Sequence, residues 1–334
     1  MNSRKNSREL YSKTEMPMKE LVVLTGPTAV GKTDISIELA KRINGEIISA
    51  DSIQVYKHMN IGSAKVTTDE MQGIKHHLID ILNPDEDFNV HIFQQMTKKC
   101  MEEIYSKGKI PIIVGGTGFY IQAVLYDINF DETGGSHDYR RELEQLAHEK
   151  GAEYLHAMLQ KIDPKSAMNI HYNNVKRVIR ALEYYHDTGK IISEHNETQR
   201  QNESPYNFAY FVLNDDRELL YSRINARVDK MIENGLYDEV KNLFDHGYDS
   251  NLVSMQGIGY KEMLECVKGN ISLDEASELI KKNTRHFAKR QLTWFRREKN
   301  VTMIDYENFN HNKEKILNEM LIILQNRNII KNIQ

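Results

Sequence analysis

Eight residues near the start of the chain combine glycine, lysine and threonine in a spacing that suits phosphate binding. They follow the apolar run Leu21–Thr25, precede an amphipathic helix pattern, and fit the pattern G-x-x-x-x-G-K-[ST]: Gly26, Pro27, Thr28, Ala29, Val30, Gly31, Lys32 and Thr33. The backbone N–H groups of such a loop surround phosphate oxygens, and the helix N-terminus adds partial positive charge. Lys32 would reach the terminal phosphates, and the Thr33 hydroxyl would ligate Mg²⁺. The pattern indicates a diphosphate or triphosphate ligand; the alternative is a turn that merely contains glycine and lysine.

An acid, Asp51, is expected at the same edge of the sheet, where the buried run 46–51 ends. A carboxylate there fits a general base, a group that helps to hold Mg²⁺, or an N-cap, and its position alone leaves the three equal. The strand predicted at Ile110–Val114 ends in glycines instead of an acid, and Asp80 is expected inside a strand. Asp51 is therefore the best-placed acid in this part of the chain, which favours a small group-transfer enzyme over a motor protein or GTPase.

Two further patterns have competing interpretations. The turn Gly115-Gly-Thr117-Gly118 would allow a substrate to approach closely, with Thr117 donating a hydrogen bond, or it is simply a strand-to-helix turn. The pair His76-His77 suggests a metal, but adjacent strand residues face opposite sides and no Cys or Glu completes a site. We interpret the histidine pair as structural or surface.

Basic residues gather in three places. Lys176 and Arg180 lie four residues apart on one predicted helical face, as do Arg223 and Arg227, either of which would suit bidentate phosphate binding. The segment 281–299 holds eight Lys or Arg against one acid, interleaved with aromatic residues. A solvated helix face is the usual explanation of such runs, whereas phosphate contacts and base stacking on RNA are the alternative.

The elements that must position these residues alternate between strands and helices. Strands are predicted at Leu21–Thr25, 46–51, His76–Leu82, Ile110–Val114 and Phe208–Leu213, with helices at 33–43 and 88–105. This alternation predicts an α/β fold, a doubly wound parallel sheet of the P-loop NTPase type with ligands at the carboxyl ends of its strands. From 138 to 186 the pattern is helical and charged, which predicts a helical insertion, and helices are expected from 217 to the end.

Composition sets the remaining bounds. The 334 residues allow one large or two modest domains, and the net charge of -4 requires any nucleic acid to meet a local basic patch. The two cysteines form no metal or disulfide pattern, which fits a reducing cytosol, and no apolar run approaches the roughly 18 residues of a membrane span. Residues 1–19 are polar and are expected to form a loose arm. We expect a cytoplasmic protein with no membrane contact.

In combination these motifs resemble the tRNA dimethylallyltransferases, also called tRNA isopentenyltransferases, from about Leu21 to Asp305. The resemblance rests on seven segments: 26–33, Asp51-Ser-Ile-Gln-Val-Tyr-Lys57, Asn60-Ile-Gly-Ser-Ala-Lys65, His76-His-Leu-Ile-Asp80, Val114-Gly-Gly-Thr-Gly-Phe-Tyr120, Gly257-Ile-Gly-Tyr-Lys261 and Ala288-Lys-Arg-Gln-Leu-Thr-Trp-Phe-Arg296. It implies transfer of a dimethylallyl group from dimethylallyl diphosphate to N6 of the adenosine at position 37 of tRNA. It also implies a core at 20–126 and 202–334, and an insertion at 127–201 that grips the anticodon stem-loop. The zinc finger of eukaryotic members is absent, which suits a bacterial enzyme. We separately expect a monomer.

The resemblance also implies roles for individual residues. The loop 26–33 would hold the diphosphate, and Lys32 would contact its phosphates. Thr28 and Arg223 would lie near the bridging oxygen, and Thr33 would bind Mg²⁺. Asp51 would be the general base. The residues expected to contact tRNA are Asp51, Ser52, Ile53, Gln54, Thr117, Arg140, Lys176, Arg177, Val178, Ile179, Arg180, Gln256, Gly257, Ile258, Gly259, Tyr260 and Lys261.

Two other functions remain open from the sequence. The first is a small-molecule enzyme with the same core, either a P-loop kinase or an isopentenyltransferase acting on free adenine nucleotide, although neither needs the insertion or the basic–aromatic segment. The second is a non-catalytic RNA-binding ATPase, which is expected to carry a Mg²⁺-holding Asp at a strand end.

Overall fold

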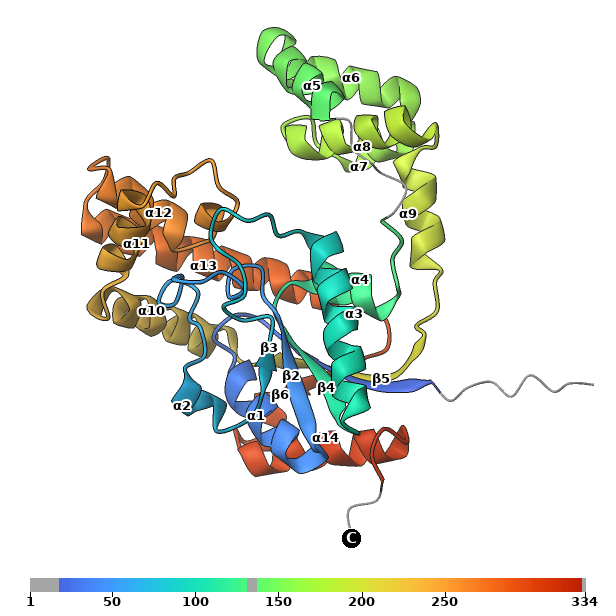
Figure 1. Cartoon of the computed structure of the whole chain (residues 1–334), viewed down its shortest axis with the longest axis vertical. Coiled ribbons are helices and arrows are strands. Elements are labelled where there is room, and N and C mark those ends of the chain that lie inside the picture. Colours follow the sequence, from blue (N-terminus) through green and yellow to red (C-terminus); the bar gives the residue numbers. More distant parts are fainter. Residues whose placement is uncertain (1–17, 131–136, 332–334) are drawn as a thin grey trace, which may run out of the picture.

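Six parallel strands form one sheet at the centre of the molecule, in the order β3-β2-β4-β1-β5-β6 (Figure 1). The computed structural model describes residues 18–130 and 137–331. The strands are β1 (Lys19–Thr25), β2 (Gly45–Ala50), β3 (His76–His77), β4 (Ile110–Gly115), β5 (Tyr206–Asn214) and β6 (Val301–Asp305). The chain first completes one side of β1 with β2, β3 and β4, and then crosses to add β5 and β6 on the other. This is the doubly wound arrangement that the sequence predicts.

Helices cover both faces of this sheet and extend the molecule beyond it (Figure 1). In the first part of the chain they are α1 (Lys32–Ile43), α2 (Thr68–Met71), α3 (Val90–Ser106) and α4 (Gly118–Leu125). The following group is α5 (His137–Lys150), α6 (Ala152–Ile162), α7 (Pro164–Asn169), α8 (Val175–Thr188) and α9 (Ile192–Arg200). The last part holds α10 (Arg217–Glu233), α11 (Leu236–Asp245), η1 (Ser254–Gln256), α12 (Tyr260–Val267), α13 (Leu273–Phe295), η2 (Tyr306–Phe309) and α14 (Lys313–Asn326).

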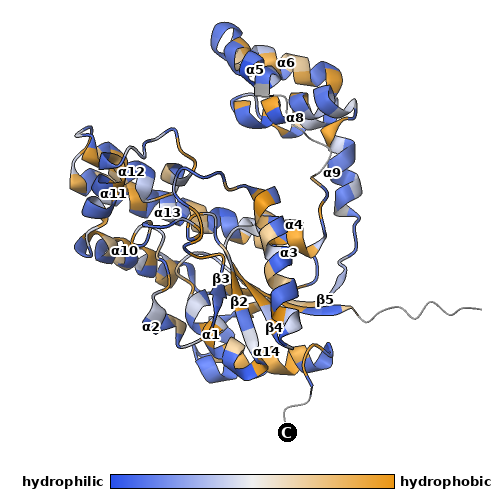
Figure 2. Ribbon diagram, viewed as in Figure 1, coloured by the Kyte–Doolittle hydropathy of each residue, from blue (hydrophilic) through white to orange (hydrophobic). Residues whose placement is uncertain are grey.

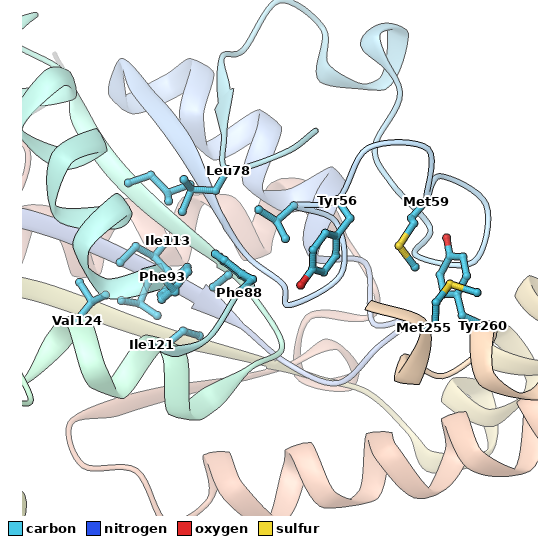
Figure 3. Close-up of a cluster of buried hydrophobic side chains, with 14 of the residues drawn as sticks. Tyr56, Met59, Leu78, Phe88, Phe93, Ile113, Ile121, Val124, Met255 and Tyr260 are labelled. Atoms are coloured by element: carbon cyan, nitrogen blue, oxygen red, sulfur yellow. The ribbon is translucent and has the colours of Figure 1, made fainter. Parts of the chain in front are cut away.

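Alternate side chains of the central strands enter two separate cores. In β1, Leu21 and Val23 pack with residues of α3, α4 and α12, whereas Val22 and Leu24 pack with residues of α1 and α14. All four are fully buried, so β1 reads as a continuous apolar run, as strands covered on both faces do. Figure 2 shows the apolar strands surrounded by helices with polar outer surfaces. Figure 3 shows aromatic, aliphatic and methionine side chains of the first core packed together.

Three sequence predictions about the core need correction. The end of the chain is not wholly helical, because Val301–Asp305 forms β6 beside β5. The strand expected at His76–Leu82 stops at His77, and Asp80 lies exposed after a turn instead of inside a strand. The chain leaves the sheet there because the N–H groups of Asp80 and Ile81 bond the carbonyls of Gln54 and Val55. The expected loose arm ends by Lys19, which begins β1, and its residues 1–17 lie outside the described ranges.

Helices α5 to α9 form a separate bundle that stands away from the sheet (Figure 1). The bundle has its own apolar core, which includes Leu143, Leu155 and Leu182. Buried Asp163 joins two of its helices by accepting hydrogen bonds from the N–H and hydroxyl groups of both Ser166 and Ser193, at 2.7–3.0 Å. Because both serines lie in the first turns of α7 and α9, one carboxylate fixes the start of each helix.

Two linkers connect this bundle to the core, and they bond to one another where they leave it. The N–H of Asn129 donates to the side chain of Gln199 at 3.0 Å, and the Asn202 amide donates to the carbonyl of Tyr126 at 3.2 Å. The outgoing and returning chains therefore lie side by side. None of the described helices is both long and apolar enough to cross a membrane.

Candidate active site

The carboxyl edge of the sheet brings the predicted chemical groups together. The four adjacent strands β2, β4, β1 and β5 end there, so the segments that follow them become neighbours. These segments are Asp51 after β2, the turn 115–118 at the end of β4, the loop 26–31 after β1, and Asp215 after β5. Ligands of open parallel sheets bind at this edge, and the molecule has its candidate site there.

The loop 26–31 depends on its glycines. Gly26 has φ +149°, and a Cβ there would lie 2.5 Å from the carbonyl oxygen of Leu213, so the neighbouring strand excludes a side chain. Gly31 has φ +97° and caps the N-terminus of α1, which starts at Lys32. The Lys32 ammonium folds back and donates to the carbonyls of Gly26 and Pro27 at 3.0 and 2.8 Å. A cation is thus centred in the loop.

Burial and two charged side chains, Arg227 and Asp51, influence the pKa of Lys32. Burial, followed by the nearby Arg227 guanidinium, lowers the pKa of Lys32 to about 7, and the Asp51 carboxylate acts in the opposite direction. Two cations and one acid therefore meet at the loop. Such crowding of positive charge is unfavourable in itself and becomes favourable when an anion of several charges enters.

A second arginine is held in place from β5. The Arg223 guanidinium donates to Asp215 at 2.6 Å, and the Asp215 side chain is completely buried whereas that of Arg223 is 42 % exposed. The buried carboxylate therefore orients an arginine that remains accessible. Tyr306, at the start of η2, completes this side: a Cβ on Gly31 would lie 3.1 Å from its hydroxyl oxygen. Burial raises the pKa of Tyr306 to about 12, so the phenol keeps its proton.

The Asp51 carboxylate is held through one of its two oxygens. Its Oδ1 accepts from the N–H groups of Ile53 and Gln54 at 2.8 and 3.3 Å, which forms a local turn; no helix begins here, so this is not the N-cap that the sequence left open. Both hydrogen bonds of Asp51 within residues 18–130 and 137–331 are made by Oδ1 and none by Oδ2. The turn fixes the orientation of the carboxylate, and the second oxygen is left to accept a proton.

The glycine-rich turn 115–118 serves packing between protein segments. A Cβ on Gly115 would lie 2.2 Å from the carbonyl oxygen of Ala50, and one on Gly118 would lie 2.3 Å from the Trp294 ring. These glycines therefore let β2 and α13 approach closely, so of the two interpretations that the sequence left open, the glycine contacts fit a strand-to-helix turn packed against protein. Thr117 itself is half-buried and stands between the two glycine contacts.

Two segments that were predicted to contact tRNA, 51–54 and 256–261, lie side by side, and the first of them begins with Asp51. A Cβ on Gly257 would lie 3.0 Å from Ile53, so the segments 51–54 and 256–261 are in contact. Tyr260 is buried and its hydroxyl donates to Glu239 at 2.8 Å, so its phenol belongs to the interior. The Gln54 amide donates to the carbonyls of Ser63 and Ala64 at 3.3 Å. Exposed Lys261 and Gln256 remain at the surface.

The remaining predicted tRNA contacts lie in the helical bundle, away from the carboxyl edge. Val178 and Ile179 are buried in the core of the bundle, so their side chains face the interior. On the same helix, Lys176 and Arg177 are exposed and remain candidates for contact with tRNA. Arg140 donates to Glu183 through Nε and Nη2 at 2.7 and 2.6 Å. Within the described residues, Arg180 is half-buried.

Most of the basic–aromatic segment 281–299 lies in α13, which ends at Phe295, and a groove of about 440 Å³ lies along the exposed face of this helix and the residues just after it. The groove is lined by His286, Lys289, Arg290, Thr293, Trp294 and Arg297. Trp294 also packs edge-on against exposed Phe119 of α4, with ring centroids 6.4 Å apart. Cations beside an exposed indole offer both of the contacts, charge and stacking, that single-stranded nucleic acids use.

A resident metal centre built by protein ligands alone is absent from the described ranges, where no group of three His, Cys, Asp or Glu could hold an ion. The His76–His77 pair is structural, as predicted: buried His77 bonds Glu46 at 2.8 Å, and His76 bonds the carbonyl of Ile74. The exposed Thr33 hydroxyl at the start of α1 fits the alternative for Mg²⁺, which binds with few protein ligands and completes its shell with phosphate oxygens and water.

Sequence reasoning did not select three residues of this site. Asp215 follows the apolar run 208–213 and lies at the same edge as Asp51, so the argument used for Asp51 applies to it equally. Gln291 lies in the segment 288–296 that carries the family resemblance, but nothing local indicates its contact with the loop; for it and for Tyr306 the relevance arises only when α13 and β6 reach the loop. The Oε1 of Gln291 accepts from the N–H of Thr28 at 2.9 Å.

The amino-acid sequence is similar to those of known proteins from one enzyme family. A family model described as IPP transferase matches residues 54–298. The chain is 59% identical over 314 residues to a tRNA dimethylallyltransferase of Lachnoclostridium phytofermentans, covering 94% of this chain and 100% of that one. It is 52% identical over 301 residues to one of Acetivibrio thermocellus, covering 90% and 96%.

Solved structures show the same relationship. The tRNA isopentenylpyrophosphate transferase of Bacillus halodurans aligns with TM-score 0.70 and 46% identity, over 93% of this chain and 98% of that one. A eukaryotic dimethylallyltransferase acting on tRNA aligns with TM-score 0.79 and 30% identity, over 94% and 81%. Because the family model spans most of the sequence and the relatives exceed half identity over nearly its whole length, this chain belongs to the IPP transferase family.

Proposed function

We propose that this protein transfers a dimethylallyl group from dimethylallyl diphosphate to N6 of adenosine 37 in the anticodon loop of tRNA, releasing diphosphate. The observation that carries the proposal is the juxtaposition at Lys32: the loop that binds phosphate and the carboxylate of Asp51 lie within electrostatic reach of one another. A leaving diphosphate and a proton acceptor are the two groups that prenyl transfer to an amine requires.

The proposed reaction follows from these positions. The N6 amine attacks C1 of the dimethylallyl group, the C1–O bond to diphosphate breaks with its electron pair leaving on oxygen, and the N6 proton passes to Asp51. The adenine amine is a weak nucleophile because its lone pair is delocalised into the ring. Proton removal by Asp51 as the C–N bond forms is worth roughly 10²–10⁴-fold.

The loop side of the site would stabilise the leaving group. The Lys32 ammonium lies in the loop at the start of α1, and the Arg223 guanidinium held by Asp215 is close enough to act on Tyr306, whose hydroxyl lies by Gly31 of the same loop. Cations placed before the reaction in a sheltered site stabilise the charge that develops on the departing diphosphate. Mg²⁺, held by Thr33 and the diphosphate itself, would neutralise part of the same charge. Thr28 lies at the mouth of the loop, near the bridging oxygen in this proposal.

The acceptor would be bound by surfaces outside this pocket. We assign tRNA contacts to Thr117, to the paired segments 51–54 and 256–261, and to the exposed cations of the insertion 127–201, with Arg140 oriented by Glu183. An adenine in a single-stranded loop leaves its stack at low cost, which allows N6 to reach Asp51. With tRNA as the acceptor, the proposed compartment is the cytoplasm.

The alternative acceptors are disfavoured by two features. An enzyme acting on free adenine nucleotide, or a small-molecule kinase, has no use for a bundle of helices standing away from the site. It also has no use for the groove on α13, which lies on an exposed helix face and combines three Lys or Arg residues with one tryptophan. Both features suit a large, negatively charged acceptor.

The test is incubation of the protein with dimethylallyl diphosphate, Mg²⁺ and unmodified tRNA, followed by mass analysis of the nucleosides. Prenylated adenosine is expected with tRNA, and none with free adenine nucleotide or with ATP in place of the prenyl donor. Asp51→Ala should slow formation of the product roughly 10²–10⁴-fold, whereas Asp85→Asn, which changes an exposed acid on the loop before α3, should leave it unchanged. Prenylation of free nucleotide as fast as tRNA would refute the assignment.

A further inference from the structure

One glutamine connects the phosphate loop to the turn at the end of β4. Gln291 lies on α13, far along the sequence from both, and is 6 % exposed. Its Oε1 accepts from the N–H of Thr28 at 2.9 Å, and its Nε2 donates to the carbonyl of Gly116 at 3.0 Å. The two ends of one amide thus join the residues that follow β1 to those that follow β4.

The orientation of this amide is determined by its partners. A backbone N–H can only donate and a carbonyl can only accept, so the amide satisfies both groups in one orientation alone. The fit is close as well, since a Cβ on Gly116 would lie 2.1 Å from Nε2. Strand β1 reinforces the same turn, because the Thr25 hydroxyl donates to the carbonyl of Gly115 at 2.7 Å.

The hydrogen bond to Thr28 matters because a phosphate-binding loop binds its ligand with backbone N–H groups. Its N–H groups bind the ligand only if each peptide is turned the correct way. Gln291 directs the N–H of Thr28 toward α13, which sets the path of the chain between Gly26 and Ala29, and Ala29 takes the left-handed conformation with φ +64°. The shape of the loop therefore depends on a side chain from outside it.

We infer that Gln291 is a positioning residue for the diphosphate: its amide holds the loop at Thr28 in the conformation that binds the donor and ties it to the turn that bears Thr117. This role deepens the proposed function and rests on it for the identity of the donor. The diphosphate group alone suffices to test it, because the loop and not the prenyl group is what Gln291 contacts.

The test compares Gln291→Met and Gln291→Glu with the unchanged protein. Methionine has nearly the same length and volume but makes neither hydrogen bond. Inorganic diphosphate with Mg²⁺ is titrated calorimetrically, and KM is measured separately for dimethylallyl diphosphate and for tRNA. For Gln291→Met we expect the diphosphate Kd and the prenyl-donor KM to rise about tenfold, which is the loss of about one to two net hydrogen bonds, with KM for tRNA within twofold.

The glutamate variant tests the pH dependence of diphosphate affinity, which would not change if Gln291 served only in packing. Ionised, its carboxylate still accepts from Thr28 but opposes the carbonyl of Gly116; protonated, it can donate to that carbonyl as the amide does. At pH 8, Gln291→Glu should bind diphosphate less tightly than Gln291→Met. At pH 5 the order should reverse, because the protonated acid restores both bonds. An unchanged order at the two pH values would contradict the hydrogen-bond role.

A matched control separates positioning from stability. Gln94 on α3 is also buried, and its amide donates to the carbonyls of Ala123 and Ile128 at 2.7 and 2.8 Å, away from the loop. Gln94→Met should lower Tm as much as Gln291→Met while leaving the diphosphate Kd within twofold. Equal diphosphate affinity in the two methionine variants would overturn the inference. Diphosphate binding by the unchanged protein without prenyl transfer would refute the proposed function instead.

Discussion

Binding of the prenyl donor should draw a proton onto Lys32. In the free protein, burial and Arg227 lower the pKa of this lysine to about 7, so at pH 8 only about one molecule in ten carries the charge. A diphosphate in the loop favours the ammonium form and returns the pKa toward its ordinary value of 10.5. The bound lysine is then fully protonated at pH 8.

The size of the effect follows from these two values. Binding should take up about 0.9 proton at pH 8 and about 0.1 at pH 6, where the free lysine is already charged. Through the same linkage, this lysine makes donor affinity fall by up to about tenfold for each pH unit above 7. Isothermal titration calorimetry in two buffers of different ionisation enthalpy measures the uptake directly.

The control is Lys32→Arg, because a guanidinium keeps its charge at every pH used and takes up no proton. Any uptake that remains in this variant belongs to the diphosphate or to other groups, and the difference between the two proteins isolates Lys32. If wild type and Lys32→Arg take up the same number of protons at pH 8, the lysine is charged before the donor arrives and the reasoning from burial and Arg227 is wrong.

Three further outcomes are expected. Asp51→Asn should slow single-turnover prenyl transfer roughly 10²–10⁴-fold while tRNA and diphosphate affinities stay within a few-fold; normal turnover would remove Asp51 as the base. Replacing Lys289, Arg290 and Arg297 together by Gln should reduce the slope of log Kd for tRNA against log salt by about 2, at roughly 0.7 per phosphate contact, and an unchanged slope would exclude the α13 groove from RNA binding. Burial raises the pKa of Glu298 to about 7 from 4.5, so the folded protein holds a proton that the unfolded chain has released, and stability should fall as pH rises through that interval. Glu298→Gln should shrink the Tm difference between pH 5 and pH 8, and an equal difference would contradict this.

The sequence predicted the parts of the fold that local pattern determines. The loop 26–33 was recognisable because its glycines, Lys32 and Thr33 are contiguous and lie between a strand and a helix. The central strands were found because burial on both faces makes them unbroken apolar runs. Strand β6 was missed because it is short, lies at the edge of the sheet, and is only partly buried, so its apolar signal is weak. The early end of β3 depends on the segment 54–57, which no local pattern near His77 reveals.

The site was predicted where one residue type suffices and missed where a partner from elsewhere decides. Asp51 stands out as an acid after a buried strand. The competing meanings of the 115–118 turn could be separated only by seeing Trp294 against Gly118, because the close approach of α13 is a tertiary fact. In the same way, the sequence predicted tRNA contact for both Val178 and Arg140 in the helical region. In the structure Val178 is buried in the core of the bundle, and Arg140 is paired with Glu183.

The bonded linkers have a consequence for how such an enzyme can change its choice of RNA. Asn129 and Gln199 are in hydrogen-bond contact, so the two chain ends of the bundle meet at one point of the core. A module with closely spaced ends can be replaced or removed by genetic exchange without stretching the scaffold that receives it. In the proposed function, the part of tRNA recognition assigned to the bundle could therefore be inherited separately from the chemistry at the sheet. A chimera that carries another relative's helices between these two residues should adopt that relative's preference among tRNAs.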